Sequence, residues 1–98
     1  MLGELTQLDF APLVTDRFRL VESGVELDLE LLSAEAATVS GHQASGRAPF
    51  SLVFRAPREP LLPQRIYALQ HSALGVLDIF LVPIGPDESG QRYEAVFS

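Results

Sequence analysis

Three carboxylates at alternate positions are the first residues in this sequence whose type and spacing suggest chemistry. Glu26, Asp28 and Glu30 lie in the run VELDLELL. In an extended strand, alternate side chains project from the same face, about 7 Å apart. That spacing suits a pair of glycosidase carboxylates or a hard cation such as calcium. Arg17 and Arg19, however, precede them in a pattern typical of cross-strand ion pairs, so we expect a solvated, salt-bridged outer face.

The histidines form no recognisable metal-binding or catalytic pattern. The chain has two, His42 and His71, and they are not a closely spaced pair of zinc ligands. No serine lies in a G-x-S-x-G elbow, and Gly41 and Gly46 lack the lysine of a P-loop. We therefore predict that both histidines lie at the surface, that the protein is not an enzyme, and that it holds no metal and no cofactor.

Composition argues against several further classes of protein. The 98 residues include no cysteine, and the formal net charge is −6. Without cysteine there is no disulfide, thiolate nucleophile or iron–sulfur ligand. An acidic chain with seven scattered arginines is a poor match for nucleic acid, because phosphate binding relies on clustered basic residues. We expect a single β-rich domain over residues 1–98, without a nucleic-acid partner.

The N-terminal segment and the apolar runs give no sign of export or membrane insertion. The opening MLGELTQLDF carries Glu4 and Asp9 where a signal peptide needs an apolar stretch. The longest apolar run, Val76–Ile84, contains Asp78 and falls far short of the ~20 residues of a membrane helix. Together with the lack of cysteine, this predicts a cytoplasmic protein with no membrane partner.

The clearest local pattern is a β-hairpin around Ser23–Gly24. Pairing outward from this two-residue loop places Arg19 opposite Asp28 and Phe18 opposite Leu29. Cation then faces anion, and apolar faces apolar. A slip of one residue would turn each apolar side chain to the wrong face, so we predict this register.

Short strands separated by glycine and proline account for most of the remaining chain. Thr6 followed by Asp9 resembles a helix N-cap, which predicts a short helix over Gln7–Leu13, limited by Pro12, that covers one end of a sheet. Ser40–Ala48 is polar and glycine-bearing, and we expect a loop there. The predicted strands are Arg17–Glu22, Val25–Leu31 with a bent continuation through Ser33 to Val39, Phe50–Ala56, Gln64–His71, Val76–Ile84 and Gln91–Phe97, with a further loop over Gly85–Gly90.

The last three predicted strands are apolar on both faces. We assign Tyr67, Tyr93, Phe80 and Val82 to one face, and the aliphatic residues of the middle strand to the other. A domain this small has enough core to cover only one side of such a sheet. One face is therefore expected to contact a protein partner or a second copy of the chain. The candidate interface residues are Leu77, Ile79, Leu81, Phe80 and Val82.

Several stretches together resemble a family of short bacterial proteins, of about a hundred residues, catalogued as a domain of unknown function. They include RAPFSLVFRAP from Arg47, EPLLPQ from Glu59, FLVPIGP from Phe80 and RYEAVF from Arg92. The resemblance covers nearly the whole chain and carries no catalytic residue. It implies a small intracellular β-rich protein, from a family often encoded near phage-tail-collar-like proteins.

These observations predict a mostly β fold, a small antiparallel β-barrel or curved meander sheet of about six strands with one short N-terminal helix. A two-layer α+β arrangement is the alternative. The predicted function is a non-enzymatic protein-interaction or assembly module, accessory to a phage-tail-like or surface fibre protein. The alternative is a small-molecule or lipid-binding β-barrel. An internal cavity with convergent polar groups would favour the ligand, whereas a solid interior with an exposed apolar sheet face would favour a protein partner.

Overall fold

The computed structural model describes residues 5–22, 25–36 and 49–97, and only the backbone of Val25. The predicted loop Ser40–Ala48, with His42, and the hairpin tip Ser23–Gly24 lie outside the described residues. No helix in the described part of the chain is long and apolar enough to cross a membrane. The elements are α1 Gln7–Phe10, the 3-10 helix η2 Ala11–Leu13, β1 Arg17–Glu22, β2 Val25–Ala36, β3 Phe50–Ala56, β4 Arg65–His71, β5 Gly75–Asp87 and β6 Gly90–Phe97.

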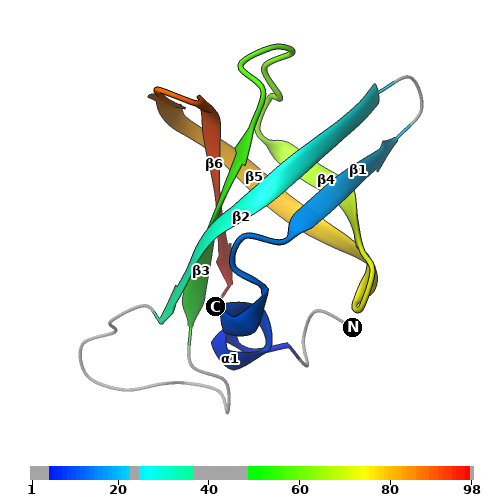
Figure 1. Ribbon diagram of the computed structural model, residues 1–98, viewed down its shortest axis with the longest axis vertical. Helices are drawn as coiled ribbons and strands as arrows, with labels where there is room; N and C mark the ends of the chain where they lie inside the picture. Colours follow the sequence, from blue (N-terminus) through cyan, green and yellow to red (C-terminus); the bar gives the residue numbers. More distant parts are fainter. Residues whose placement is uncertain (1–4, 23–24, 37–48, 98) are drawn as a thin grey trace.

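The six strands close into an antiparallel barrel, which confirms the predicted fold class and not the two-layer alternative (Figure 1). Around the barrel the order is β1-β2-β3-β6-β5-β4. The chain thus forms two three-stranded meanders, which meet edge to edge at β3–β6 and at β1–β4. A single continuous meander is therefore wrong, because the segment after β3 crosses one end of the barrel to reach β4.

The connection between β3 and β4 covers that end of the barrel. It contains Pro57, Pro60 and Pro63, which have no N–H to contribute to a sheet. Two inward-facing tyrosines hold it in place. The Leu62 N–H donates to the Tyr93 hydroxyl at 3.0 Å, and the Tyr67 hydroxyl donates to the Pro63 carbonyl at 2.5 Å.

The β1–β2 hairpin has the predicted register. Arg19 lies opposite Asp28 and Phe18 opposite Leu29. Phe18 and Leu29 have no exposed surface, whereas Arg19 and Asp28 point outward. Alternation of polar and apolar residues was sufficient to predict this pairing, because a two-residue loop leaves little freedom in how the strands meet.

The barrel interior is filled by one face of every strand. Along β3, Phe50, Leu52 and Phe54 are fully buried and alternate with half-buried residues. The Phe54 ring meets the Phe18 ring edge-on, at a centroid distance of 5.2 Å. Each fully buried side chain of this size contributes about 1.5 to 3 kcal/mol through removal of apolar surface from water. The core is therefore a single aromatic-rich cluster inside the barrel.

The N-terminal helix closes the opposite end of the barrel, as predicted (Figure 1). Phe10 is fully buried, with its ring centroid 5.8 Å from Phe50 and 6.0 Å from Phe97. The Asp9 carboxylate accepts the Thr6 N–H at 2.7 Å, which caps the first turn. The α-helix ends at Phe10, and the chain continues as η2, which contains Pro12 at its N-terminus. Proline cannot donate the backbone hydrogen bond that an α-helix interior needs.

Two strand boundaries differ from the prediction. β2 runs to Ala36 and bends at a register shift between Leu31 and Ser33. β5 continues to Asp87 and β6 begins at Gly90, so the loop predicted over Gly85–Gly90 is too long and is reduced to a turn at residues 88–89. A register shift between Pro83 and Gly85 lets β6 pair with this proline-containing segment, and Gly85 takes a positive φ of 110°.

The faces of β5 also differ from the prediction. Ile79 lies opposite Tyr67 on β4, so both point into the barrel, and the assignment of Phe80 and Val82 to the same face as Tyr67 is wrong. Because both faces of this strand are apolar, alternation alone left the choice of inner face open. The register across β4 and β5 decides it.

Candidate functional site

The carboxylate row of β2 lies on the outer face of the barrel, where it is paired with arginines. Arg19 contacts both Glu26, at 3.2 Å, and Asp28, at 3.4 Å. Glu30 lies 3.8 Å from the guanidinium of Arg55 on the next strand. The predicted salt-bridged outer face is confirmed. The side chains of these carboxylates are 36% to 80% exposed to solvent, and the geometry gives none of them the enclosed setting of a catalytic acid.

His71 is buried, not at the surface as predicted. Its side chain is 3% exposed, and its ring centroid lies 4.7 Å from that of Phe18. Nε2 lies 2.8 Å from the Asp16 carboxylate, and Nδ1 accepts the N–H groups of Ala73 and Leu74 at 3.0 and 3.4 Å. Because Nδ1 accepts these hydrogen bonds, Nε2 carries the ring proton and donates a hydrogen bond to the Asp16 carboxylate. Nδ1 thus closes the β4–β5 turn, while Nε2 ties the end of β4 to the residue before β1. Both ring nitrogens are engaged, and neither is placed to act as a general base.

A second polar cluster seals the seam between β1 and β4. Glu22 accepts the backbone N–H of Ala68 at 3.1 Å and the guanidinium of Arg65 at 2.5 Å. Arg65 in turn lies 4.0 Å from the centre of the Tyr67 ring. The hydrogen bond from Arg65, followed by that from Ala68, lowers the pKa of Glu22 below its ordinary value of 4.5. Burial raises the pKa of the Tyr67 hydroxyl.

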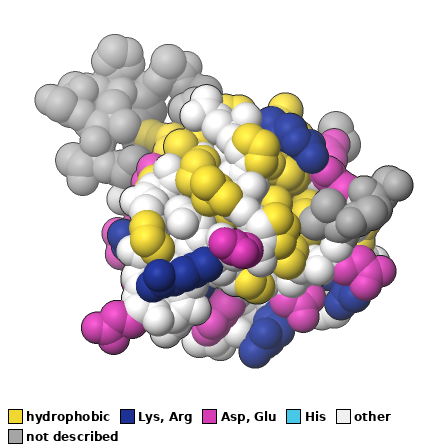
Figure 2. Space-filling view, turned by 90° about the horizontal axis from the view of Figure 1, so that it is seen from above, with side chains coloured by type: hydrophobic (Ala, Val, Ile, Leu, Met, Phe, Trp, Pro, Cys, Tyr) yellow, Lys and Arg dark blue, Asp and Glu magenta, His cyan; other side chains and the backbone are white. Residues whose placement is uncertain are grey.

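A small hollow of about 220 Å³ lies beside this seam, under the β3–β4 connection. Leu20, Tyr67 and the exposed Leu61 contribute apolar surface to it, and the Glu22–Arg65 pair forms its polar rim. Figure 2 looks onto this end of the barrel and shows hydrophobic side chains gathered there beside acidic and basic ones. Its charged groups, Glu22 and Arg65, already form an ion pair with each other.

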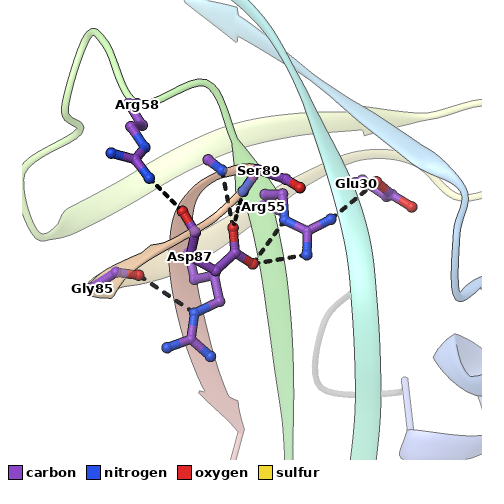
Figure 3. Close-up of polar contacts among 8 residues, drawn as sticks. Glu30, Arg55, Arg58, Gly85, Asp87 and Ser89 are labelled. Carbon is purple, nitrogen blue, oxygen red and sulfur yellow. Dashed lines mark hydrogen bonds and ion pairs between the residues drawn. The ribbon is translucent and has the colours of Figure 1, made fainter.

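The most connected polar cluster surrounds Asp87 at the β5–β6 turn (Figure 3). One carboxylate oxygen accepts hydrogen bonds from Nε and Nη2 of Arg55, at 3.0 and 2.7 Å. The other accepts hydrogen bonds from the backbone N–H groups of Ser89 and Gly90, at 2.8 and 2.9 Å. Arg58 donates to the Asp87 carbonyl at 2.6 Å. These bonds, led by that from Arg55, lower the pKa of Asp87 to about 2. The cluster ties the end of β3 to the β5–β6 turn and holds Asp87 as an anion.

Gly90 is part of the same junction. A Cβ atom at this position would lie 2.3 Å from the backbone oxygen of Ala56. The β6 backbone therefore approaches the end of β3 more closely than any side chain allows, which requires glycine here.

A groove of about 390 Å³ runs along the outer side of this junction. Its sides are the charged outer face of β2 and the end of β3 together with the residues that follow it. The lining residues are Arg17, Glu26, Leu27, Asp28, Glu30, Arg55, Ala56, Pro57 and Ser89.

The outer face of β4, β5 and β6 is apolar at several positions. Phe80 lies directly opposite Ile66, and their exposed fractions are 46% and 57%. Val96 on β6, 64% exposed, lies two residues beyond Glu94, which pairs with Val82. Because β5 and β6 are antiparallel, two residues forward on β6 correspond to two residues back on β5, so Val96 lies on the Phe80 side of Val82. We call Ile66, Phe80, Val82 and Val96 the outer apolar face.

The candidate interface residues divide between the two sides of the barrel wall. Leu77, Ile79 and Leu81 are 6%, 1% and 0% exposed and belong to the core. Phe80 and Val82 point outward, with Phe80 about half exposed and Val82 half-buried. Of the five candidate residues, Phe80 and Val82 are therefore the two that are accessible from outside the barrel. Sequence reasoning missed Ile66 and Val96 as their neighbours, because the registers of β4 with β5 and of β5 with β6 are set by contacts between strands, which strands that are apolar on both faces do not reveal.

Comparison with known proteins defines the family of the chain without assigning it an activity. No curated protein and no solved structure matches the sequence. One family model matches residues 5–97, which include all six strands and both short helices. The chain therefore belongs to the family described as Domain of unknown function (DUF6916).

Proposed function

We propose that this protein is a non-enzymatic interaction module that binds another protein molecule through the outer apolar face. The observation that carries the proposal is the direct cross-strand pair of Phe80 and Ile66, both about half exposed on the outside of a barrel whose inside is already filled. Single exposed apolar residues are ordinary in soluble proteins, but neighbouring ones on adjacent strands are typical of interaction sites.

The energetics of the barrel favour this surface. The inward residues Leu77, Ile79 and Leu81 supply the contribution of β5 to folding. The outward residues Phe80 and Ile66 are only partly buried by folding, since about half of each side chain stays in contact with water. Covering them by a partner would contribute about 25 cal/mol for each Å² of apolar surface removed from water.

The polar clusters support a structural role over a catalytic one. Asp87 is held by Arg55 and two backbone N–H groups, and His71 is held at both ring nitrogens. General acid–base catalysis needs a group free to exchange a proton with substrate. The hydrogen bonds of these groups instead join strands and close turns.

The interior supports a protein partner over a small-molecule or lipid ligand. Phe18, Phe54, Tyr67 and Tyr93 project into the barrel and are at most 1% exposed. Among the described residues, no buried side-chain nitrogen or oxygen lacks a hydrogen-bond partner. A ligand site would present polar groups converging on an open cavity.

For the biological process we propose an accessory role in the assembly of a phage-tail-like or surface fibre structure, in the cytoplasm of a bacterium. The support is the resemblance to bacterial proteins encoded near phage-tail-collar-like proteins. A small, rigid barrel with one apolar outer face is suited to such a role, because it adds one specific contact without a moving part.

The proposal is tested by comparing Phe80→Arg with Asp78→Arg, two outward positions on the same strand. Sedimentation and solution scattering measure self-association, and affinity capture from native cells followed by binding of the purified candidate measures association with another protein. We expect Phe80→Arg to abolish the association and Asp78→Arg to preserve it, with both variants as stably folded as the parent. Equal binding by the parent and Phe80→Arg would contradict the proposal.

A further inference from the structure

We propose that the open edge of β2, over residues 26–29, accepts an extended strand of a partner protein whose outward side chains are basic. This site is separate from the outer apolar face. In the barrel order, β3 and β6 lie between β2 and β5. The inference therefore goes beyond the proposed function, and the two surfaces can be tested one without the other.

The open edge is the part of β2 that extends beyond its pairing with β3. β2 pairs with β1 from Val25 onward, whereas its pairing with β3 begins only at Glu30, opposite Arg55. Within the described part of the chain, no strand is registered against the other side of β2 before Glu30. The two strands diverge toward the top of Figure 1. The backbone along this edge is thus available to a further strand.

Pro57 explains why β3 stops following β2. It comes directly after the last residue of β3, Ala56, and it has no backbone N–H to donate to the neighbouring strand. From there the chain turns across the end of the barrel, which leaves a gap between the upper part of β2 and the end of β3.

The groove of about 390 Å³ occupies this gap. With a strand rise of about 3.4 Å per residue, the edge from Glu26 to Leu29 spans about 10 Å, the length of a short added strand. Leu27 is half-buried and lines the groove together with Ala56 and Pro57. A guest strand would place its inward side chains on this apolar floor, in the manner of β-strand addition.

The charge of the groove selects the guest. On the outer face of β2, the side chains of Glu26, Asp28 and Glu30 are 80%, 43% and 36% exposed. Arg19, on the β1 side, contacts both Glu26 and Asp28, so one guanidinium faces two carboxylates and one negative charge stays in excess. Arg55, which lines the groove, makes its shortest contact with Asp87, at 2.7 Å. Opposite charges directly across two strands are stabilising, and like charges are destabilising. Arginine or lysine at alternate positions of the guest therefore fits this face.

The same acidic row disfavours edge-to-edge pairing of two copies. A second β2 would bring Glu26 and Asp28 against their own counterparts, and each pair of carboxylates would have one arginine, Arg19, on its β1 side. Charged residues commonly protect sheet edges from unwanted pairing. Here the protection is directional, because it repels acidic strands and attracts basic ones. The occupant is thus a strand of a different protein with alternating apolar and basic residues.

The experiment uses the full-length protein and a fluorescein-labelled peptide of alternating valine and arginine, long enough to span the edge. Two control peptides have glutamate in place of arginine, or proline at the central valine. Fluorescence anisotropy measures affinity, and hydrogen–deuterium exchange locates the bound peptide. We expect both controls to bind at least about tenfold more weakly, because one repels the acidic row and the other loses a backbone donor.

A matched pair of charge reversals on the protein places the site. Glu26→Lys is expected to weaken binding of the arginine peptide by about threefold or more and to strengthen binding of the glutamate peptide. Asp78→Lys makes the same change in net charge on β5 and should affect both peptides much less. Slower exchange of the amides of residues 26–29 on adding the arginine peptide would support the inference. Absence of binding, equal binding of the arginine and proline peptides, or protection confined to β4–β6 would overturn it.

Discussion

The Glu22 carboxylate accepts the backbone N–H of Ala68, at 3.1 Å, where the ladder between β1 and β4 ends. Registered pairing between these strands covers only Arg19 with Gln70 and Leu20 with Leu69. Backbone pairing thus joins β1 and β4 over two residue pairs, and the Glu22 side chain extends this seam by one further hydrogen bond. Barrel closure depends on this seam, and its strength should depend on the charge of one glutamate.

The first prediction concerns acid stability at this seam. The folded-state pKa of Glu22 is lowered from its ordinary value of 4.5 by Arg65 and Ala68. Its contribution is therefore complete above pH 4.5 and is lost as the pH falls through the lowered folded-state pKa. At pH 7, Glu22→Gln should reduce the free energy of unfolding by about 1 to 2 kcal/mol.

Urea unfolding at a series of pH values checks this, with Glu26→Gln as a matched control on the exposed face. The deficit of Glu22→Gln should shrink as the pH is lowered, while the control stays close to the parent throughout. A deficit for Glu22→Gln that is unchanged at low pH would show that its charge is not the source.

The second prediction concerns Asp87. Asparagine keeps an acceptor for the N–H groups of Ser89 and Gly90 but loses the ion pair with Arg55. Because the pKa of Asp87 is lowered to about 2 from 3.8, the ion pair stabilises the fold above pH 3.8 and is lost as the pH falls toward 2. Asp87→Asn should be less stable than the parent at pH 7, and its deficit should be much smaller near pH 2, where about half of the Asp87 carboxyls are protonated. Thermal unfolding at both values decides this, and an equal deficit at both would refute it.

The third prediction concerns Gly90. A methyl group here would meet the Ala56 carbonyl at 2.3 Å, so one backbone must move. Gly90→Ala should cost about 1 to 3 kcal/mol, the usual range for overpacking. Ser89→Ala, one residue earlier in the exposed turn, keeps its N–H and is the control. If both variants unfold at the same urea concentration, the close approach of β6 to β3 is not as described.

The fourth prediction tests the two faces of β5. Ile79 is 1% exposed and Phe80 is 46% exposed. Ile79→Ala should cost about 2 to 5 kcal/mol, the range for deleting a buried side chain, whereas Phe80→Ala should change stability by less than about 1 kcal/mol. Urea unfolding of the two variants is sufficient. If Phe80→Ala lost more stability than Ile79→Ala, Phe80 would belong to the core and the outer apolar face would be wrong.

The fifth prediction concerns the buried histidine. His71→Leu leaves the N–H groups of Ala73 and Leu74 without their acceptor, and should cost about 1 to 3 kcal/mol. Asp16→Asn still offers an oxygen to Nε2, so its effect should be smaller. Guanidinium unfolding compares them. A harmless His71→Leu would show that the imidazole is not what holds the β4–β5 turn.

Strand positions and the first hairpin were predictable from the sequence because their side chains alternate cleanly. Arg19 and Asp28 mark the outside, and Phe18 and Leu29 mark the inside. On β5, Ile79 and Phe80 are both large and apolar, and composition alone does not distinguish inner from outer. That choice depends on pairing with Tyr67, a contact between different strands.

The polar clusters were harder to predict, because their members are far apart in the sequence. Asp16 and His71 are brought together by the closure of β1 on β4, and Arg55 and Asp87 by the pairing of β3 with β6 and of β6 with β5. Because a six-residue loop was predicted over Gly85–Gly90, Asp87 was not identified as the residue that closes the turn. The sequence signal that could have revealed it is the Asp-x-x-Gly spacing from Asp87 to Gly90, which suits a tight turn closed by the aspartate side chain.

Photocrosslinking from position 80 tests the central claim most directly. The photoreactive residue p-benzoylphenylalanine would replace Phe80 in the full chain, in native cells, and would replace Glu88 in the exposed β5–β6 turn as the control. The account predicts one discrete crosslinked species from position 80, either a dimer of this chain or an adduct with another protein, which is absent from position 88 and abolished by Ile66→Arg. No crosslink from position 80, or the same products from both positions, would contradict a protein-binding role for the outer apolar face.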